Sequence, residues 1–159
     1  MEKDFSVHPK KTVRSGYEKI ATRYASARKP GTEDVELLKM LIDRLTPGDL
    51  VIDAGCGSGY PVATLLTESF LVTGVDFAGE LLRLAKERAP RAMLVCADIT
   101  SLPFRNSTFD AVVSYYSIIH IPRDEHEHLL TDFYRILKPG GLVLLCMGAG
   151  DLPSDFSNW

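Results

Sequence analysis

The stretch Val51-Ile52-Asp53-Ala54-Gly55-Cys56-Gly57-Ser58-Gly59 decides the fold. Its first part belongs to a short apolar run, Leu50 to Ala54, bounded by glycines, which is typical of a strand buried on both faces of a sheet. Its second part has glycine at alternate positions, so it lacks the Cβ atoms that would keep a ligand away from the backbone. The stretch therefore predicts a central parallel strand and a turn into a helix where a ligand can bind.

Apolar runs of the same kind recur along the chain, at Phe70 to Val75, Ala92 to Cys96, Ala111 to Tyr115 and Leu142 to Met147. Helical patterns lie between them, at Tyr60 to Thr67, Glu80 to Arg88 and Asp124 to Leu137. Two further helices are expected before the first strand, from Ser15 to Ala27 and between Thr32 and Leu45. Strands that alternate with helices predict an α/β, doubly wound fold, with a mostly parallel sheet of five strands and helices on both faces.

Composition predicts one domain over residues 1–159. The chain is 45% apolar and 25% charged, which is ordinary for a globular domain. Its 18 basic and 21 acidic side chains are mixed and give a formal net charge of −3, so we expect no nucleic-acid partner. No segment has the length of a signal peptide or membrane span, and we expect a cytoplasmic protein without membrane contact.

The cysteines and histidines give no indication of a metal site. Cys56, Cys96 and Cys146 lack the paired spacing of zinc ligands or of a disulfide framework, and we expect buried, reduced thiols. His126 and His128 are two residues apart, so a helix directs them to different sides. The sequence therefore predicts no bound metal.

An aspartate stands at the end of each of the first three predicted strands: Asp53, Asp76 and Asp98. Asp76 follows the glycine loop at about the 20-residue distance at which an acidic residue binds ribose hydroxyls in dinucleotide folds. Taken singly, Asp76 also fits a helix cap or a turn, and Asp98 also fits a surface turn. Three carboxylates grouped at neighbouring strand ends favour a ligand with an ammonium, a diol and an amine over a diphosphate, which prefers amides and a helix terminus.

Five motifs in order resemble those of the class I S-adenosylmethionine-dependent methyltransferases: residues 51–59, Gly74-Val75-Asp76, Cys96-Ala97-Asp98, Phe109-Asp110-Ala111-Val112 and Leu137-Lys138-Pro139-Gly140-Gly141. The resemblance extends from about Tyr17 to Met147. It implies the strand order 3-2-1-4-5 and S-adenosylmethionine as cofactor.

The resemblance also implies roles for individual residues. The loop that contains Gly55, Cys56, Gly57 and Gly59 would touch the methionine part of the cofactor, and Asp53 would orient its amino end. Asp76 would bind both ribose hydroxyls. The adenine would lie beside Phe77, with Asp98 and Ile99 at its edge. Ser114 resembles the position whose backbone lies beside the methionine amino group.

Three residues outside these motifs are further candidates. Tyr17 and Tyr24 resemble an N-terminal segment that closes over the cofactor, although their helical spacing equally fits core packing. His120 is the best placed general base, should the acceptor need to lose a proton, and it also fits a cap of a loop or helix.

The chain departs from the family pattern at its end. The family's sheet has seven strands, whereas this sequence has material for five: residues 1–48 form the N-terminal helices, 49–147 the core and 148–159 an irregular tail. Leu142 to Met147 would then be an uncovered apolar edge, and such edges favour pairing with another chain. We therefore expect a chain that lacks the last two strands and forms a homodimer through this edge.

These observations favour a methyltransferase that acts on a small-molecule acceptor. A homologue that binds the cofactor without transferring a methyl group is the first alternative. A nicotinamide-dependent oxidoreductase is the second, and it is disfavoured because Tyr60 stands where the dinucleotide fingerprint has glycine or alanine.

Overall fold

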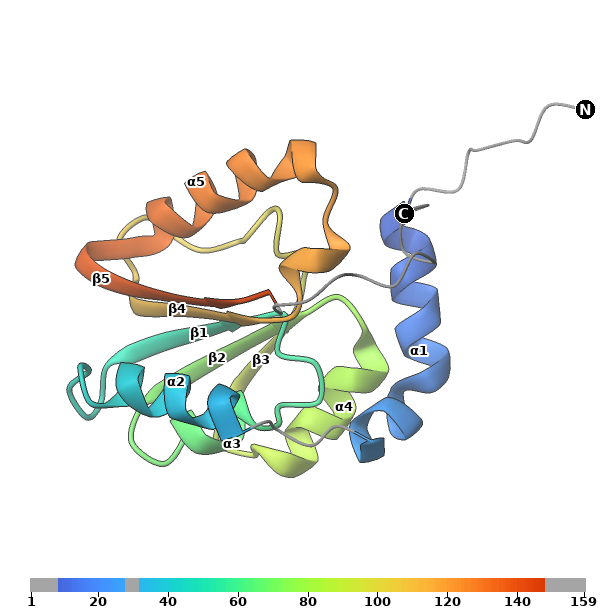
Figure 1. Ribbon diagram of the computed structural model, residues 1–159, viewed down its shortest axis with the longest axis horizontal. Helices are drawn as coiled ribbons and strands as arrows, with labels where there is room; N and C mark the ends of the chain where they lie inside the picture. Colours follow the sequence, from blue (N-terminus) through green and yellow to red (C-terminus); the bar gives the residue numbers. More distant parts are fainter. Residues whose placement is uncertain (1–8, 28–31, 148–159) are drawn as a thin grey trace, which may run out of the picture.

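The computed structural model describes residues 9–27 and 32–147 and is built around one sheet (Figure 1). The strands are β1 (Leu50–Ala54), β2 (Leu71–Asp76), β3 (Met93–Cys96), β4 (Phe109–Tyr115) and β5 (Leu137–Cys146). They lie in the order β3-β2-β1-β4-β5, and each neighbouring pair is parallel. The predicted parallel sheet and its strand order are confirmed.

Helices cover both faces of this sheet, as predicted. They are α1 (Pro9–Ala27), α2 (Thr32–Ile42), α3 (Val62–Leu66), α4 (Gly79–Arg88) and α5 (His126–Ile136), with short 3-10 turns η1 (Ile118–His120) and η2 (Arg123–Glu125). In Figure 1, α5 lies on one face, α2, α3 and α4 lie on the other, and α1 stands at the end of the sheet toward which the strands run. Across the described ranges, no helix has the length and apolar character needed to cross a membrane.

The core consists of two apolar layers, one on each face of the sheet. On one face, Leu38 of α2 and Leu66 of α3 pack against Val51 and Val113. On the other, Phe133 and the neighbouring apolar side chains of α5 pack against the sheet. Burial from both sides explains why the central strands read as continuous apolar runs instead of alternating patterns.

The amino ends of the strands are tied together on the side opposite α1. Asp110, near the start of β4, accepts hydrogen bonds from Lys138 Nζ at 2.9 and 2.7 Å and from the backbone N–H of Leu50 at 2.9 Å. One carboxylate thus connects the beginnings of β4, β5 and β1.

Two elements begin well before the residues at which the sequence predicts them. β5 begins at Leu137 instead of Leu142, because Leu137 pairs with Phe109, and the pairing then shifts register so that Ala111 pairs with Leu142 beyond the Pro-Gly-Gly segment. α1 begins at Pro9, six residues earlier than predicted, and Ile20 is 47% exposed. α1 packs mainly on α4, so a narrower stripe of the helix is covered than in a helix that lies on the sheet.

The three thiols are free, but they are not all buried. Cys56 and Cys146 are buried as predicted, whereas Cys96 is exposed, which corrects the prediction. Cys96 lies on β3, an outer strand on which none of the residues is buried. The tail over residues 148–159, expected to be irregular, lies outside the described residues.

Candidate functional site

A cavity opens at the carboxyl ends of the strands, where α1 passes over them. Its empty space, including the part open to solvent at the mouth, is about 870 Å³. Eleven of the thirteen predicted site residues line it: Tyr17, Tyr24, Asp53, Gly55, Cys56, Gly57, Asp76, Phe77, Asp98, Ile99 and His120. The fold thus brings residues from distant motifs to one place.

The glycine loop after β1 forms the floor of the cavity, and its three glycines serve different purposes. All three have positive φ, +82° at Gly55, +52° at Gly57 and +80° at Gly59. A Cβ on Gly55 would collide with Ser117, and one on Gly59 would lie 3.3 Å from Ala85 of α4. A Cβ on Gly57 would meet nothing within 4 Å, so this glycine keeps the cavity open.

The backbone donors of this loop are largely used within the protein. The N–H groups of Gly55 and Cys56 donate to the carbonyl oxygen of Val75 at 2.8 and 2.9 Å, and that of Gly59 donates to Cys56. The N–H of Gly57 donates to Asp76 Oδ2 at 2.9 Å. The loop is therefore rigid, and its amides are not arranged to receive a diphosphate.

Asp76 closes β2 with a buried carboxylate that is 6% exposed. Besides the bond from Gly57, its Oδ1 accepts the N–H of Ala78 at 2.9 Å. Burial raises the pKa of Asp76, and the hydrogen bonds from Ala78 and Gly57 oppose this shift without cancelling it. A carboxylate has about four acceptor positions, so Asp76 can hold the loop and still accept hydrogen bonds from a diol.

Asp53 and Cys56 lie deep in the same part of the cavity. Asp53, on β1, is 1% exposed. Burial raises the pKa of the Cys56 thiol, and the carboxylates of Asp53 and Asp76 raise it further. These effects favour the neutral thiol over the nucleophilic thiolate at Cys56.

The turn after β3 supplies the far wall. Asp98 Oδ1 accepts the N–H of Thr100 at 2.9 Å and its hydroxyl at 2.8 Å, and this fixes the turn beside Ile99. Asp98 therefore fits both of its interpretations. Its carboxylate shapes the turn, and the residue also lines the cavity.

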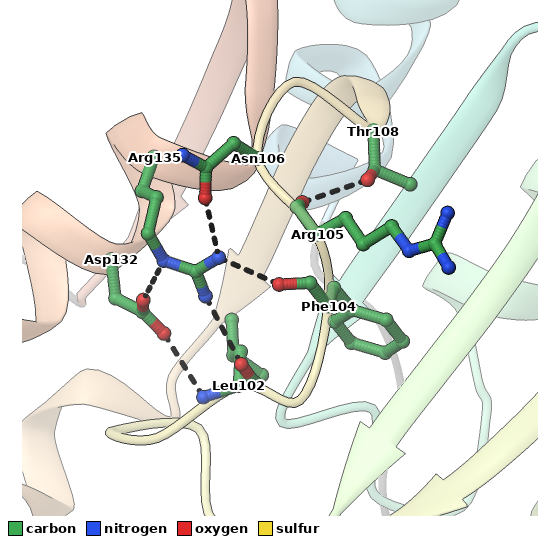
Figure 2. Close-up of polar contacts among 7 residues, drawn as sticks. All are labelled: Leu102, Phe104, Arg105, Asn106, Thr108, Asp132 and Arg135. Carbon is green, nitrogen blue, oxygen red and sulfur yellow. Dashed lines mark hydrogen bonds and ion pairs between the residues drawn. The ribbon is translucent and has the colours of Figure 1, made fainter.

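The loop that continues from this wall is anchored to α5 (Figure 2). Asp132 accepts the N–H of Leu102 at 2.9 Å and the Nε of Arg135 at 2.6 Å. The guanidinium of Arg135 donates in turn to the carbonyl oxygens of Leu102, at 3.1 Å, and Phe104, at 2.6 Å. This network fixes the loop that follows the far wall of the cavity. The residues of the network do not themselves line the cavity.

Ser114 and Gly59 are the two predicted residues that do not line the cavity. Ser114 is fully buried, and its hydroxyl donates to the carbonyl oxygen of Ala54 at 2.9 Å, which ties β4 to β1. The cavity lining begins at the next residue along the chain and includes Tyr115, Tyr116 and Ser117. Tyr116 has a φ of +56°, which is unusual for a residue other than glycine.

α1 is docked on the site at two points. Glu18 accepts the N–H of Gly79 at 2.7 Å and that of Glu80 at 3.0 Å, so a side chain of α1 caps the N-terminus of α4. Arg88, at the other end of α4, donates to the carbonyl oxygen of Ala25 at 3.1 Å and to the hydroxyl of Ser58 at 2.7 Å. The helix is thereby held against both α4 and the glycine loop.

This docking places two aromatic residues of α1 in the cavity. The rings of Tyr17 and Tyr24 meet edge to face, with centroids 5.1 Å apart. The hydroxyl of Tyr17 lies 2.9 Å from Nε2 of His120, on η1. Burial lowers the pKa of His120, which favours the neutral imidazole.

Several lining residues were missed by the sequence reasoning: Val13, Ser58, Tyr60, Val62, Leu81, Ala97, Tyr115, Tyr116, Ser117 and Ile121. Ser58 and Ala97 lie within a predicted motif, and Tyr60, Tyr115 and Ile121 each directly follow a predicted site residue. For these five, adjacency is the signal that would have found them. Glu18 and Arg88 carry no such signal, because their partners are distant in the sequence. Across the described ranges, no group of three His, Cys, Asp or Glu side chains is arranged to hold a metal ion.

Comparisons with known proteins agree with this geometry. Residues 51–141 match the family described as "Methyltransferase domain". The demethylmenaquinone methyltransferase of Tropheryma whipplei (strain Twist) is 31% identical over 104 residues, which are 64% of this chain and 43% of the relative. The tRNA (carboxymethyluridine(34)-5-O)-methyltransferase of Arabidopsis thaliana is 27% identical over 143 residues, 89% of this chain and 34% of the relative.

A solved structure shows the same fold. The TehB-like SAM-dependent methyltransferase of Corynebacterium glutamicum superimposes with a TM-score of 0.69 at 24% identity, over 93% of this chain and 80% of that one. The chain spans less than half the length of the two curated relatives. Since the family match covers more than half of the sequence and includes the glycine loop and the ends of β1 to β4, the chain belongs to the class I S-adenosylmethionine-dependent methyltransferases.

Proposed function

We propose that this chain binds S-adenosylmethionine and transfers its methyl group to a small-molecule acceptor. The observation that carries the proposal is the single cavity in which the glycine loop, three strand-end aspartates and the Tyr17–His120 pair meet. The family match supports the cofactor, and the acceptor is argued from charge and from the relatives.

The residues fit the cofactor by their shape and their donors. Gly57 leaves open space where a side chain would lie, and this cradle suits the methionine chain. Asp53 would hold the amino group, and Asp76 would hold the ribose diol. The wall at Asp98 and Ile99 would hold the adenine. The bound cofactor supplies a methyl group on a positively charged sulfur.

Electrostatics favour this cofactor over a nicotinamide dinucleotide. The cavity is lined by the carboxylates of Asp53, Asp76 and Asp98, and the loop amides are already bonded within the protein. A diphosphate would be repelled there, whereas an ammonium and a sulfonium are attracted. The protein's own contribution is to align the reactants and to exclude water, because displacement at a sulfonium needs no activated protein nucleophile.

The acceptor is proposed to be a small molecule. The relative from Tropheryma whipplei is named for a menaquinone precursor, and the one from Arabidopsis thaliana for a tRNA nucleoside. The net charge of −3, with basic residues dispersed, supports the former class, because tRNA binding needs a basic surface. The homologue without transferase activity remains the alternative, since the chain covers under half of these relatives.

Calorimetric titration with S-adenosylmethionine and S-adenosylhomocysteine tests the cofactor. Binding of both by folded protein is expected, and no binding would overturn the proposal. Transfer of a radiolabelled methyl group to a small-molecule extract and to total tRNA then tests the acceptor. Label in the small-molecule fraction supports the proposal, label in tRNA overturns the acceptor class, and binding with no transfer favours the cofactor-binding homologue.

A further inference from the structure

We propose that the part of the cavity at the end of β4 is an acceptor subsite, and that it takes an apolar, ring-containing molecule without an anionic group. This inference rests on the proposed methyl transfer and names the class of acceptor that the same site would receive. It assigns Tyr60, Tyr115 and Tyr116 to that acceptor, and none of the three is among the residues proposed to hold the cofactor.

The strand order divides the cavity into two parts. β1 pairs with β2 on one side and with β4 on the other, and β3 lies beyond β2. The strand-end residues proposed for the cofactor belong to β1, β2 and β3 and to the turns that follow them. The lining at the end of β4 lies on the other side of β1, and this part of the cavity is left for the acceptor.

Aromatic and apolar side chains form the walls of this second part. Tyr115 and Tyr116 stand at the end of β4, and their rings meet edge to face with centroids 6.2 Å apart. Tyr60 and Val62 line the cavity where α3 begins. Val62 and Tyr115 belong to one apolar cluster, so the start of α3 adjoins the end of β4. A ring bound between them would pack against tyrosine rings, which is a favourable arrangement for aromatic groups.

The hydroxyl groups of the two β4 tyrosines are bonded to α2. The hydroxyl of Tyr115 donates to the backbone carbonyl oxygen of Asp34 at 2.8 Å, and that of Tyr116 donates to Asp34 Oδ1 at 2.6 Å. Burial is the main cause that raises the pKa of Tyr115, and it keeps this hydroxyl protonated. A hydroxyl has a single proton to donate, so these two side chains offer a ligand their rings and no hydroxyl donor.

The charges around the cavity disfavour an anionic acceptor. The carboxylates of Asp53, Asp76 and Asp98 line it, and among the described lining residues none is lysine or arginine. Asp34 adds a further carboxylate at the tyrosine wall. The ammonium and sulfonium of the cofactor are set against its own carboxylate and do not balance these groups. A phosphate or carboxylate on the acceptor would therefore lose its hydration without gaining a cationic partner.

The test uses three probes that share a naphthalene ring and carry different charges at the same ring position: naphthol, naphthylmethylamine and naphthyl phosphate. Their dissociation constants are measured by calorimetry near neutral pH, on protein saturated with S-adenosylhomocysteine. We expect the neutral and the ammonium probe to bind at least about tenfold more tightly than the phosphate, because only the phosphate meets like charge.

Variants of Tyr60 locate the binding. Tyr60 is exposed at the cavity, so its replacement removes little of the core. Tyr60→Ala should weaken naphthol binding about tenfold through loss of the ring contact, and Tyr60→Phe should restore it. Tyr134→Ala is the matched control, because Tyr134 lies on α5, is 81% exposed and does not line the cavity. This control should bind naphthol as the wild type does.

Equal or tighter binding of naphthyl phosphate would overturn the inference, and so would naphthol binding that is absent or unaffected by Tyr60→Ala. Each of these results would leave the proposed function intact, because binding of S-adenosylhomocysteine is measured first on the same protein. Failure of that first titration would overturn the proposed function, and the acceptor subsite with it.

Discussion

The carboxylate of Asp76 accepts a hydrogen bond from the backbone N–H of Gly57 at 2.9 Å, so the end of β2 holds the glycine loop that follows β1. Two motifs 19 residues apart are thus one unit. A residue proposed to bind the ribose thus also fixes the shape of the surface on which the methionine chain would lie.

Asp76→Ala should weaken S-adenosylmethionine binding by about 2 to 4 kcal/mol, because the variant loses charge-assisted hydrogen bonds to the diol and releases the loop. Calorimetry measures the change. Asp43→Ala, at an exposed aspartate after α2, is the matched control and should bind as the wild type does. Unchanged affinity in Asp76→Ala would contradict the ribose assignment.

Cofactor affinity should fall on acidification at a pH above the usual range of an aspartate, about 4. Burial raises the pKa of Asp76, so the carboxylate becomes protonated, and loses its charge, before an exposed aspartate would. Dissociation constants between about pH 5 and 8 measure this dependence. Asp76→Asn should flatten the profile at a weaker affinity, and an equally steep profile in that variant would assign the effect to another group.

Gly57→Val should abolish cofactor binding in a protein that still folds, because its side chain would point into open cavity space. Gly140→Val is a close control, since Gly140 also has a positive φ, +79°, and also leaves open space around a Cβ, but it lies on β5 outside the cavity lining. Each substitution should cost at least about 1 to 2 kcal/mol of stability for the left-handed backbone, and Gly140→Val alone should keep its affinity. Calorimetry and urea unfolding separate the two effects, and unfolding of Gly57→Val alone would make that glycine structural.

Asp110→Asn should lower the free energy of unfolding by about 1 kcal/mol at pH 7, through loss of the ion pair with Lys138. Burial raises the pKa of Asp110, but the hydrogen bonds from Lys138 and Leu50 outweigh it and hold the pKa below its usual value. The stabilisation is therefore present above the unfolded pKa of about 3.9 and is lost as the pH falls through the lower folded pKa. Urea unfolding should show a difference between wild type and variant at pH 7 that disappears at low pH, and a constant difference would contradict the ionic origin.

We also expect self-association through the edge of β5. Val143 is 47% and Met147 51% exposed there, whereas Leu144 packs toward the core. Val143→Lys with Met147→Lys should reduce a dimer to a monomer in light scattering, because charges oppose strand pairing at an edge. Leu71→Lys, at an equally exposed apolar residue on β2, should leave the mass unchanged. A monomeric wild type at high concentration would overturn the expectation.

Local sequence patterns were sufficient for the sheet and for most of the cavity floor. Glycines at alternate positions and aspartates at strand ends are short-range signals, and the parallel topology gathers them automatically. Ser114 lies one position before the cavity lining, which begins at Tyr115, and the positive φ of Tyr116 in this segment is unusual for a tyrosine and has no local sequence signal. The bond between Tyr17 and His120 joins residues 103 positions apart, and no local pattern encodes a contact of that range.

The guanidinium of Arg88 couples the stability of α1 to that of the glycine loop. By bonding to Ala25 and Ser58 together, it makes α1 and the glycine loop a single cooperative unit. By linkage, a ligand that stabilises the loop in this bonded arrangement also stabilises the docked position of the helix. Binding of a ligand at the glycine loop should then slow hydrogen exchange along α1. The exchange rate of this helix would therefore show whether the cavity is filled.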